Sequence, residues 1–294
     1  MYSGSIVALV TPMVESGEVD FHAWDALLAW HLAEGTDGIV VAGTTGESPT
    51  VSLDEVVELT RRAATRLGGR IPLIAGSGTN DTAGSIARTR RLAEAGADAV
   101  LAVTPYYNKP TQEGLFQHFT ALAEESSVPV ILYNVPSRTG VDLLPETAAR
   151  LAAHPRIVAL KEATGSMARL SALRDSCGED LELLSGDDPT AAEAMLAGAS
   201  GVISVTANVA PRAMRELCDA ALNARAERAR ELDDRLQVLH RALFVESNPI
   251  ATKWAVEQLG LMRGGIRLPL TRLSEHGQIT VREAMRAAGV ECAR

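Results

Sequence analysis

A lysine stands at the end of a short apolar run. In "IVALKEATG", residues 157–165, four apolar residues precede Lys161, as in a strand that is buried on both faces. Low-dielectric surroundings disfavour an ammonium group, so the free amine becomes available to attack a carbonyl and form a Schiff base. An ion pair with Glu162, exposure to solvent at the strand end, or service as a general base would fit the same stretch. Lys161 is therefore a candidate nucleophile with these alternatives open.

A second candidate is the turn "GTTGES", residues 43–48, which follows another apolar run. Glycines at a turn between a strand and a helix can serve the turn alone. The free backbone N–H groups and the hydroxyls of Thr44 and Thr45 also suit a small carboxylate. The turn lacks the Gly-Lys-Ser/Thr ending of a nucleotide-binding P-loop. It is a candidate carboxylate site.

A third candidate is "YNVPSRTG", residues 133–140, which places a phenol at a strand end and a guanidinium five residues later. Taken singly, a buried tyrosine and a surface arginine need no function. Together with Lys161 on the next apolar run they supply the parts of one mechanism. Tyr133 can relay protons, Lys161 can form an imine, and Arg138 can bind a second carboxylate through two hydrogen bonds.

The elements that must position these groups are eight short apolar runs bounded by turn residues. The runs begin near residues 5, 37, 71, 98, 129, 157, 181 and 201, with helix-period stretches such as 54–68 between them. Nearly continuous apolar strands favour a parallel sheet that is covered on both faces. Eight such units predict an α/β fold, a (β/α)8 TIM barrel. No strand is expected after residue 208, so we predict a catalytic barrel over 1–224 and a C-terminal helical domain over 225–294.

The barrel predicts where the chemistry lies, because active sites of this fold occupy the C-terminal ends of the strands. The three candidate stretches all fall there. None of the six histidines does, and the three cysteines lack the spacing of metal ligands. We therefore expect neither a Ser-His-Asp triad nor a metal site.

The composition of the chain excludes some classes of binding partner. Charged residues make up 22% of the 294 residues, the formal net charge is −9, and basic residues form only short clusters such as "RTRR" at 88–91. This balance disfavours a nucleic-acid partner and an anionic membrane. The N-terminal apolar run is too short for a signal core or a membrane span, so we expect a cytoplasmic protein.

Seven motifs together resemble the dihydrodipicolinate synthase family, and the resemblance runs from end to end. In chain order they are "GTTGES", "VTPYYNKPTQEG", "YNVPSRTG", "KEATG", "SGDD", "GVISVTANV" and "NPI..KW". The resemblance implies a cofactor-free enzyme of the pyruvate-dependent class I aldolase superfamily that serves diaminopimelate and lysine biosynthesis. Pyruvate would condense with Lys161, and the resulting enamine would attack the aldehyde of L-aspartate 4-semialdehyde.

The resemblance also implies roles for further residues. A proton relay would consist of Tyr133, Thr44 and Tyr107, with Tyr107 reaching into the site of a neighbouring subunit. Substrate contacts would come from Thr45, Arg138, Gly186 and Ile203. Thr45 would hold the pyruvate carboxylate, and Arg138 would receive the carboxylate of the semialdehyde. Members of the family form homotetramers built as dimers of tight dimers, so the same assembly is expected here.

Many members of the family are inhibited by lysine at an interface between subunits. The corresponding positions here are Ser48, Leu53, Val56, Asn80, Gly84 and Tyr106. Leu53, Val56 and Gly84 stand where lysine-sensitive relatives carry two histidines and a glutamate. An ammonium group that leaves water needs a carboxylate or several acceptors. The resemblance therefore implies a degenerate regulatory site and weak inhibition by lysine.

Two alternatives to this function remain. The first is another pyruvate lyase of the superfamily, such as N-acetylneuraminate lyase or a 2-keto-3-deoxy-sugar aldolase. Arg138 argues against it, because a sugar substrate needs hydroxyl partners at that position and a second anion needs a cation. The other is a non-catalytic barrel that senses a keto acid. The joint presence of Lys161, Tyr133, Thr44 and Tyr107 argues against a sensor.

Overall fold

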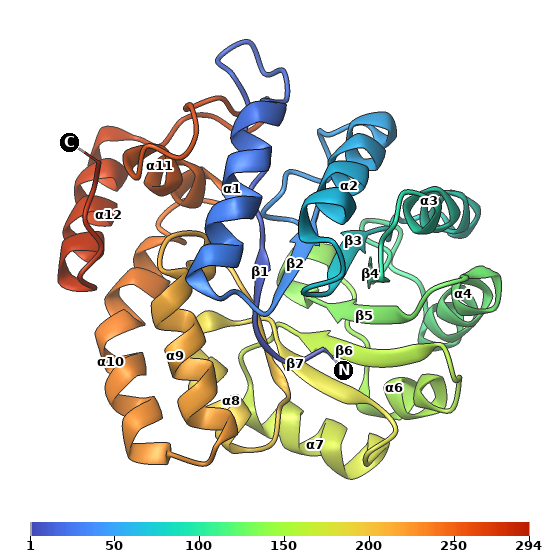
Figure 1. Cartoon of the computed structure of the whole chain (residues 1–294). Coiled ribbons are helices and arrows are strands. Elements are labelled where there is room, and N and C mark those ends of the chain that lie inside the picture. Colours follow the sequence, from blue (N-terminus) through green and yellow to red (C-terminus); the bar gives the residue numbers. More distant parts are fainter. Residues whose placement is uncertain (1, 294) are drawn as a thin grey trace.

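The computed structural model describes residues 2–293 and contains a closed barrel of eight parallel strands (Figure 1). The strands are β1 (Gly4–Ala8), β2 (Gly38–Val41), β3 (Leu73–Gly76), β4 (Ala99–Val103), β5 (Val130–Asn134), β6 (Ile157–Glu162), β7 (Glu182–Ser185) and β8 (Gly201–Ser204). Each strand pairs with the next, and β8 pairs with β1 to close the barrel. The predicted (β/α)8 barrel is confirmed, and every strand begins within two residues of its predicted start.

Helices connect successive strands on the outside of the barrel. They are α1 (Phe21–Glu34), α2 (Leu53–Leu67), α3 (Thr82–Glu94), α4 (Gln112–Glu125), α5 (Pro136–Thr139), α6 (Pro145–Ala152), α7 (Met167–Cys177), α8 (Ala191–Leu196) and α9 (Pro211–Leu222). Short 3₁₀ turns precede α8 and α9: η1 (Asp188–Thr190) and η2 (Thr206–Asn208). Sequence fixes several helix ends. Ser52 and Glu55 form a reciprocal capping box at the start of α2, and Gly68 ends that helix in a left-handed conformation.

Three further helices follow the barrel: α10 (Ala226–Ala242), α11 (Ile250–Gln258) and α12 (Glu275–Ala287). Figure 1 shows α10 alongside α9, with α11 and α12 at one end of the barrel. The expected helical extension is present, whereas the division into two domains at residue 224 stays a prediction. Among residues 2–293 no helix combines the length and the apolar character that crossing a membrane requires.

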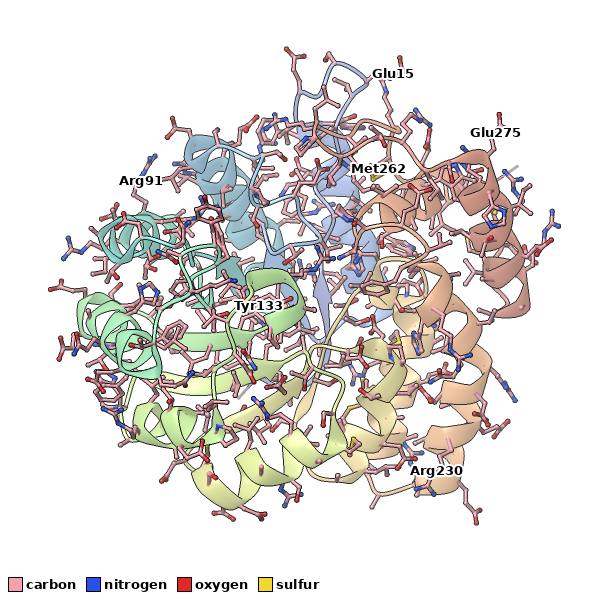
Figure 2. The ribbon with its side chains drawn as sticks, turned by 180° about the vertical axis from the view of Figure 1, so that it is seen from behind. Glu15, Arg91, Tyr133, Arg230, Met262 and Glu275 are labelled. Atoms are coloured by element: carbon pink, nitrogen blue, oxygen red, sulfur yellow. The ribbon has the colours of Figure 1, made fainter. Side chains whose placement is uncertain are left out.

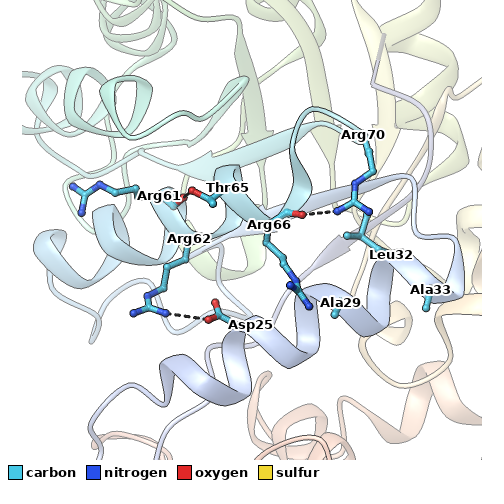
Figure 3. A pocket seen from close by; sticks show the side chains of 9 residues that line it. All are labelled: Asp25, Ala29, Leu32, Ala33, Arg61, Arg62, Thr65, Arg66 and Arg70. Carbon is cyan, nitrogen blue, oxygen red and sulfur yellow. Dashed lines mark hydrogen bonds and ion pairs between the residues drawn. The ribbon is translucent and has the colours of Figure 1, made fainter.

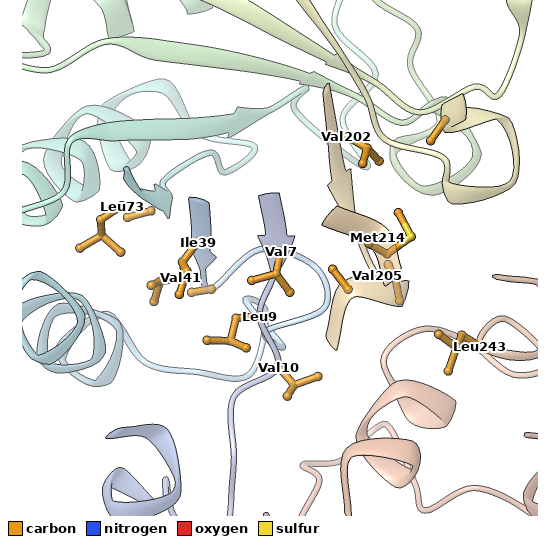
Figure 4. Packing of buried hydrophobic residues seen from close by; sticks show 14 of the residues in the cluster. Val7, Leu9, Val10, Ile39, Val41, Leu73, Val202, Val205, Met214 and Leu243 are labelled. Carbon is orange, nitrogen blue, oxygen red and sulfur yellow. The ribbon is translucent and has the colours of Figure 1, made fainter. Parts of the chain in front are cut away.

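Two apolar cores follow from the alternation of side chains along the strands. In β1, Ile6 points into the barrel, whereas Val7 packs against the surrounding helices. Figure 4 shows the outer layer, in which Val7, Ile39 and Val202 of three strands lie close together, with Met214 of α9 nearby. The inner core is a separate cluster that includes Tyr133 of β5. The same alternation directs residues near the strand ends either into the barrel or away from it.

Candidate active site

Strand register brings Tyr133 and Lys161 together at the C-terminal end of the barrel. The two residues are direct partners in the pairing of β5 with β6. Ile131 and Ala159, two positions earlier in the same strands, belong to the inner core, so the alternation directs Tyr133 and Lys161 inward as well. Figure 2 shows Tyr133 in the middle of the molecule, whereas Arg91 and Arg230 lie at its edge.

Lys161 is buried, with 6% of its surface exposed, and its Nζ lies 4.3 Å from the centroid of the Tyr133 ring. Within residues 2–293 no carboxylate oxygen comes within 4.0 Å of this nitrogen. Glu162, on the opposite face of the strand, instead accepts hydrogen bonds from Asn134 Nδ2 at 3.0 Å and from the backbone N–H of Thr164 at 2.7 Å. The alternative pairing of Lys161 with Glu162 is therefore not formed, and the amine faces the barrel.

Gly186, just beyond β7, leaves room for the lysine side chain. A Cβ at this position would lie 2.9 Å from Lys161 Cε and 2.7 Å from Ala163 Cβ. Both distances are shorter than carbon atoms tolerate without displacement. The absence of a side chain at residue 186 thus permits the position of Lys161.

A cavity of about 270 Å³ opens above Lys161 at the strand ends. Six of the expected site residues line it: Thr44, Thr45, Tyr133, Arg138, Lys161 and Gly186. Arg138, in the short helix α5, is exposed, whereas Lys161 is buried. The cavity therefore combines a buried amine with an exposed guanidinium, and it suits a small ligand that carries a carbonyl and carboxylates.

Asn248 also lines the cavity, and sequence analysis assigned it no role. Its Nδ2 donates to Thr45 Oγ1 at 2.9 Å, and its backbone carbonyl oxygen accepts from Arg138 Nη2 at 3.5 Å. Thr252 Oγ1 donates to Asn248 Oδ1 at 3.1 Å, which fixes the orientation of the amide. Asn248 thus connects the residues expected to hold the two carboxylates. Its only sequence signal is the "NPI..KW" motif.

Two expected site residues lie outside this cavity. Tyr107 is 88% exposed, and its backbone has a φ of +73°, which is rare for a residue other than glycine. Ile203 of β8 is 1% exposed and belongs to the inner core, opposite Ile6 of β1. The expected place of Tyr107 in the proton relay and the expected contact of Ile203 with substrate stay predictions.

The expected regulatory residues are divided between two environments. Ser48 and Tyr106 line a second cavity, of about 260 Å³, next to the first. The other four positions, Leu53, Val56, Asn80 and Gly84, are not part of its lining. Val56 is fully buried in the outer core. A Cβ on Gly84 would lie 2.6 Å from Asp81 Oδ2, which caps α3 by accepting from the Gly84 N–H, so a larger residue would disturb this cap.

A buried ion pair holds the turn that carries Thr44 and Thr45. Glu47, with a φ of +58°, directs its carboxylate to the ammonium of Lys253 in α11, and both side chains are buried. Glu47 Oε2 also accepts from the backbone N–H of Arg267 at 3.1 Å. Burial lowers the pKa of Lys253, whereas the Glu47 charge raises it. The C-terminal helical segment therefore fixes the conformation of this turn.

Arg267 extends this arrangement to the start of α2. Its guanidinium Nη1 donates to Glu55 Oε2 at 2.8 Å and to the carbonyl oxygen of Thr50 at 2.7 Å. The hydrogen bond from Arg267 lowers the pKa of Glu55 to about 2. The C-terminal segment thus holds the turn at Glu47 and the chain that follows it at Thr50 and Glu55. We refer to Glu47, Glu55, Lys253 and Arg267 as the clamp.

A larger hollow, of about 850 Å³, lies between α1 and α2 on the outer surface (Figure 3). Four of its nine lining residues are arginines, and Arg62 pairs with Asp25 at 3.0 Å. Eight of its nine lining residues lie on α1 and α2, the ninth, Arg70, follows α2, and no candidate nucleophile lines it. Within residues 2–293 no group of three or more His, Cys, Asp or Glu side chains is arranged to hold a metal. The cavity at Lys161 remains the candidate active site.

The chain is similar to known proteins along nearly its whole length. The model of the dihydrodipicolinate synthetase family matches residues 1–288. The 4-hydroxy-tetrahydrodipicolinate synthase of Azoarcus sp. (strain BH72) is 56% identical over 291 residues, which cover 99% of this chain and all of that protein. The corresponding protein of Stutzerimonas stutzeri (strain A1501) is 54% identical over 290 residues, covering 99% of each chain.

Solved structures of similar proteins share the fold closely. The chloride-inhibited dihydrodipicolinate synthase from Acinetobacter baumannii, complexed with pyruvate, is 49% identical with a TM-score of 0.98, and the match covers 99% of this chain and 100% of that one. The dihydrodipicolinate synthase from Aquifex aeolicus is 44% identical with a TM-score of 0.97, and the match covers both chains completely.

Proposed function

Because this chain belongs to the dihydrodipicolinate synthetase family, we propose that the cavity at Lys161 condenses pyruvate with L-aspartate 4-semialdehyde. The activity is that of a 4-hydroxy-tetrahydrodipicolinate synthase, a carbon–carbon lyase of diaminopimelate and lysine biosynthesis. The observation that carries the proposal for the site is the buried amine of Lys161, which has no ion-pair partner among residues 2–293 and lies beside Tyr133.

In the proposed reaction, the Lys161 amine attacks the keto carbon of pyruvate, and loss of water gives an iminium ion. Removal of a methyl proton converts the iminium ion to an enamine, whose carbon attacks the aldehyde carbon of the semialdehyde. The aldehyde oxygen takes up a proton and becomes a hydroxyl. The amino group of the second substrate then displaces the lysine nitrogen, which closes the ring and regenerates the free amine.

The surroundings of Lys161 support the assignment of the other roles. The centroid of the Tyr133 ring lies 4.3 Å from Nζ, which supports a role for its phenol in proton exchange with intermediates on the amine, and Thr44 lines the same cavity. Thr45, held by Asn248, suits the pyruvate carboxylate, and Arg138 suits the carboxylate of the second substrate. The chemistry uses no cofactor and no metal. A coupled assay with aspartate semialdehyde, run beside N-acetylneuraminate and 2-keto-3-deoxy-sugar acids, distinguishes the proposed substrates from those of the sister lyases.

We expect Arg138→Ala to lower kcat/KM for the semialdehyde by roughly ten- to a hundredfold, because a charge-assisted contact contributes about 1.5–3 kcal/mol. Formation of the pyruvate adduct should be nearly unchanged, since Lys161 and Thr45 remain in place. Single-turnover trapping with borohydride measures the first step, and the coupled assay measures the whole reaction. Arg156→Ala is the control, because it removes an exposed arginine just before the start of β6, at the opposite end of that strand from Lys161. Equal losses in both steps would contradict this role for Arg138.

We expect L-lysine to inhibit this enzyme only weakly. The cavity that contains Ser48 and Tyr106 has no carboxylate among its lining residues, and it contains Arg88, which repels an ammonium group. One missing charge-assisted contact corresponds to roughly ten- to a hundredfold weaker binding. Titration of lysine into the coupled assay at subsaturating pyruvate measures the effect. Half-inhibition well below about 1 mM, equivalent to about 4 kcal/mol of binding free energy, would show that the expectation is wrong.

We further propose a cytoplasmic homotetramer built from tight dimers, in which Tyr107 completes the relay of a second subunit. Its 88% exposure supports this role, since the side chain is not packed against its own barrel. Mixed assembly tests the contribution across subunits. Tyr107→Phe and Lys161→Ala chains, each inactive alone, should regain activity when they are unfolded and refolded together, because one site per mixed pair then contains both residues. Failure to regain activity in verified mixed dimers would place Tyr107 outside the relay.

A further inference from the structure

The second cavity contains a cation that the proposed reaction does not use. This cavity, of about 260 Å³, lies at the C-terminal ends of the strands beside the Lys161 cavity, and we call it the Arg88 cavity. Its polar lining includes Ser48, Thr79, Arg88 and Tyr106. It shares Thr44 and Tyr133 with the Lys161 cavity, so whatever occupies it also contacts the proposed proton relay.

The side chain of Arg88 turns inward from α3, and its guanidinium group has only some of its hydrogen-bond partners and no counter-charge. Its Nε donates to the carbonyl oxygen of Gly76 at 3.0 Å, whereas Nη2 is shielded from solvent and has no hydrogen-bond partner among residues 2–293. No carboxylate in that range forms an ion pair with it. The neighbouring surface arginines differ, since Arg90 pairs with Glu125 and Arg91 with Asp54. An inward-facing guanidinium without a counter-charge costs free energy unless a ligand supplies one.

The lining determines the charge and the size of such a ligand. No Asp or Glu lines the cavity, so its net field is positive. The hydroxyls of Ser48 and Tyr106 can donate hydrogen bonds to a ligand, whereas that of Thr79 donates to the carbonyl oxygen of Asp81 at 2.9 Å. The volume equals that of roughly eight or nine water molecules at about 30 Å³ each. A carboxylate of two to five carbon atoms meets both conditions. Burial also lowers the pKa of Arg88, which is consistent with a guanidinium group that has no carboxylate beside it.

We propose that the Arg88 cavity binds a small carboxylate, paired with the Arg88 guanidinium, and that the bound anion slows the reaction at Lys161. The effect on rate rests on the proposed function. When the cavity is empty, Arg88 contributes a positive potential at Tyr133, which favours the phenolate that forms when Tyr133 gives up its proton. A bound carboxylate cancels that potential. Proton transfer through Tyr133 then becomes slower.

Binding is tested first, without reference to catalysis, by thermal unfolding in sodium acetate up to about 100 mM, since a ligand of the folded state raises the Tm. The three proteins compared are the unmodified chain, Arg88→Met and, as the matched surface control, Arg90→Met. The unmodified chain and Arg90→Met should gain several degrees more than Arg88→Met over the titration. Equal gains in all three proteins would overturn the proposal, because acetate would then bind elsewhere, such as in the Lys161 cavity.

Arg88→Met should fold, because methionine removes the uncompensated charge and keeps most of the side-chain length. Arg88→Gln serves as a second variant of different polarity. If both variants are unfolded before acetate is added, Arg88 has a purely structural role and the proposal is wrong.

The effect on rate is tested in the coupled assay at saturating pyruvate. Acetate should lower kcat several-fold in the unmodified chain and in Arg90→Met, whereas Arg88→Met should keep its acetate-free rate throughout the titration. Inhibition that persists in Arg88→Met would overturn the regulatory role. The two proposals fail separately. An inactive protein with the expected difference in Tm would contradict the proposed function alone, and an active protein with equal gains in Tm would contradict the Arg88 site alone.

Discussion

Replacement of Lys161 by alanine should lower kcat by about a thousandfold or more, because the variant has no nucleophile with which to form the imine. The fold should persist. The amine forms no ion pair within residues 2–293, so its removal leaves no buried charge without a partner. Treatment with pyruvate and borohydride, followed by mass spectrometry of the peptide that contains residue 161, should show a covalent adduct in the unmodified chain and none in the variant.

Lys161→Arg is the matched variant, since it keeps the positive charge but does not form a stable imine. It should be as inactive as Lys161→Ala. This comparison separates imine formation from electrostatic stabilisation by a cation. The general-base alternative predicts normal turnover without any borohydride adduct in the unmodified chain. A loss of only about 2 kcal/mol of transition-state stabilisation would leave a few per cent of the rate. If Lys161→Arg retained more than that, the imine mechanism would be excluded.

Lys253→Met should destabilise the protein by about 3–5 kcal/mol, because it leaves the buried carboxylate of Glu47 without its counter-charge. The variant should also raise the KM for pyruvate, since Glu47 belongs to the turn that carries Thr44 and Thr45. Urea unfolding monitored by circular dichroism gives the free energy, and the coupled assay gives KM and kcat separately.

A double variant and a surface variant control this experiment. Glu47→Gln combined with Lys253→Met removes both charges and should recover part of the lost stability, which measures the coupling between the two residues. Arg212→Met breaks the exposed pair with Glu34 and should cost less than about 1 kcal/mol. If Lys253→Met costs no more than Arg212→Met, the buried pair does not support the turn.

The part of the site inside the barrel, Lys161 and Tyr133, could be predicted from the sequence because strand periodicity determines its position. Lys161 and Tyr133 each end an apolar run, and in a closed parallel barrel such residues meet at one end. The eight strand positions followed from the same pattern. Gly186 was expected to line the cavity only through family resemblance. The physical reason for a glycine there, its contact with the Lys161 side chain, required coordinates.

The contacts that the C-terminal helical segment makes with the site could not be predicted in this way. Asn248 and Lys253 lie in the helical segment after the barrel, and no periodic pattern relates them to a turn some two hundred positions earlier in the chain. Glu47 belongs to the "GTTGES" turn, but its partner could not be inferred from spacing. Arg88 belongs to the basic cluster "RTRR" at 88–91, a pattern that is typical of a solvent-exposed helix surface. Only the packing of α3 against the strand ends turns it inward.

The clamp has a consequence for the order in which the chain is synthesised. All eight strands, together with Lys161 and Tyr133, leave the ribosome before Lys253 and Arg267 do. A nascent barrel therefore lacks the partner of Glu47 and the amide that orients Thr45, so the turn that receives the keto acid is still unsupported. We therefore expect competence to bind pyruvate to arise only as the last helices dock. Truncated or stalled chains would then contain the reactive lysine without the turn that delivers a keto acid to it.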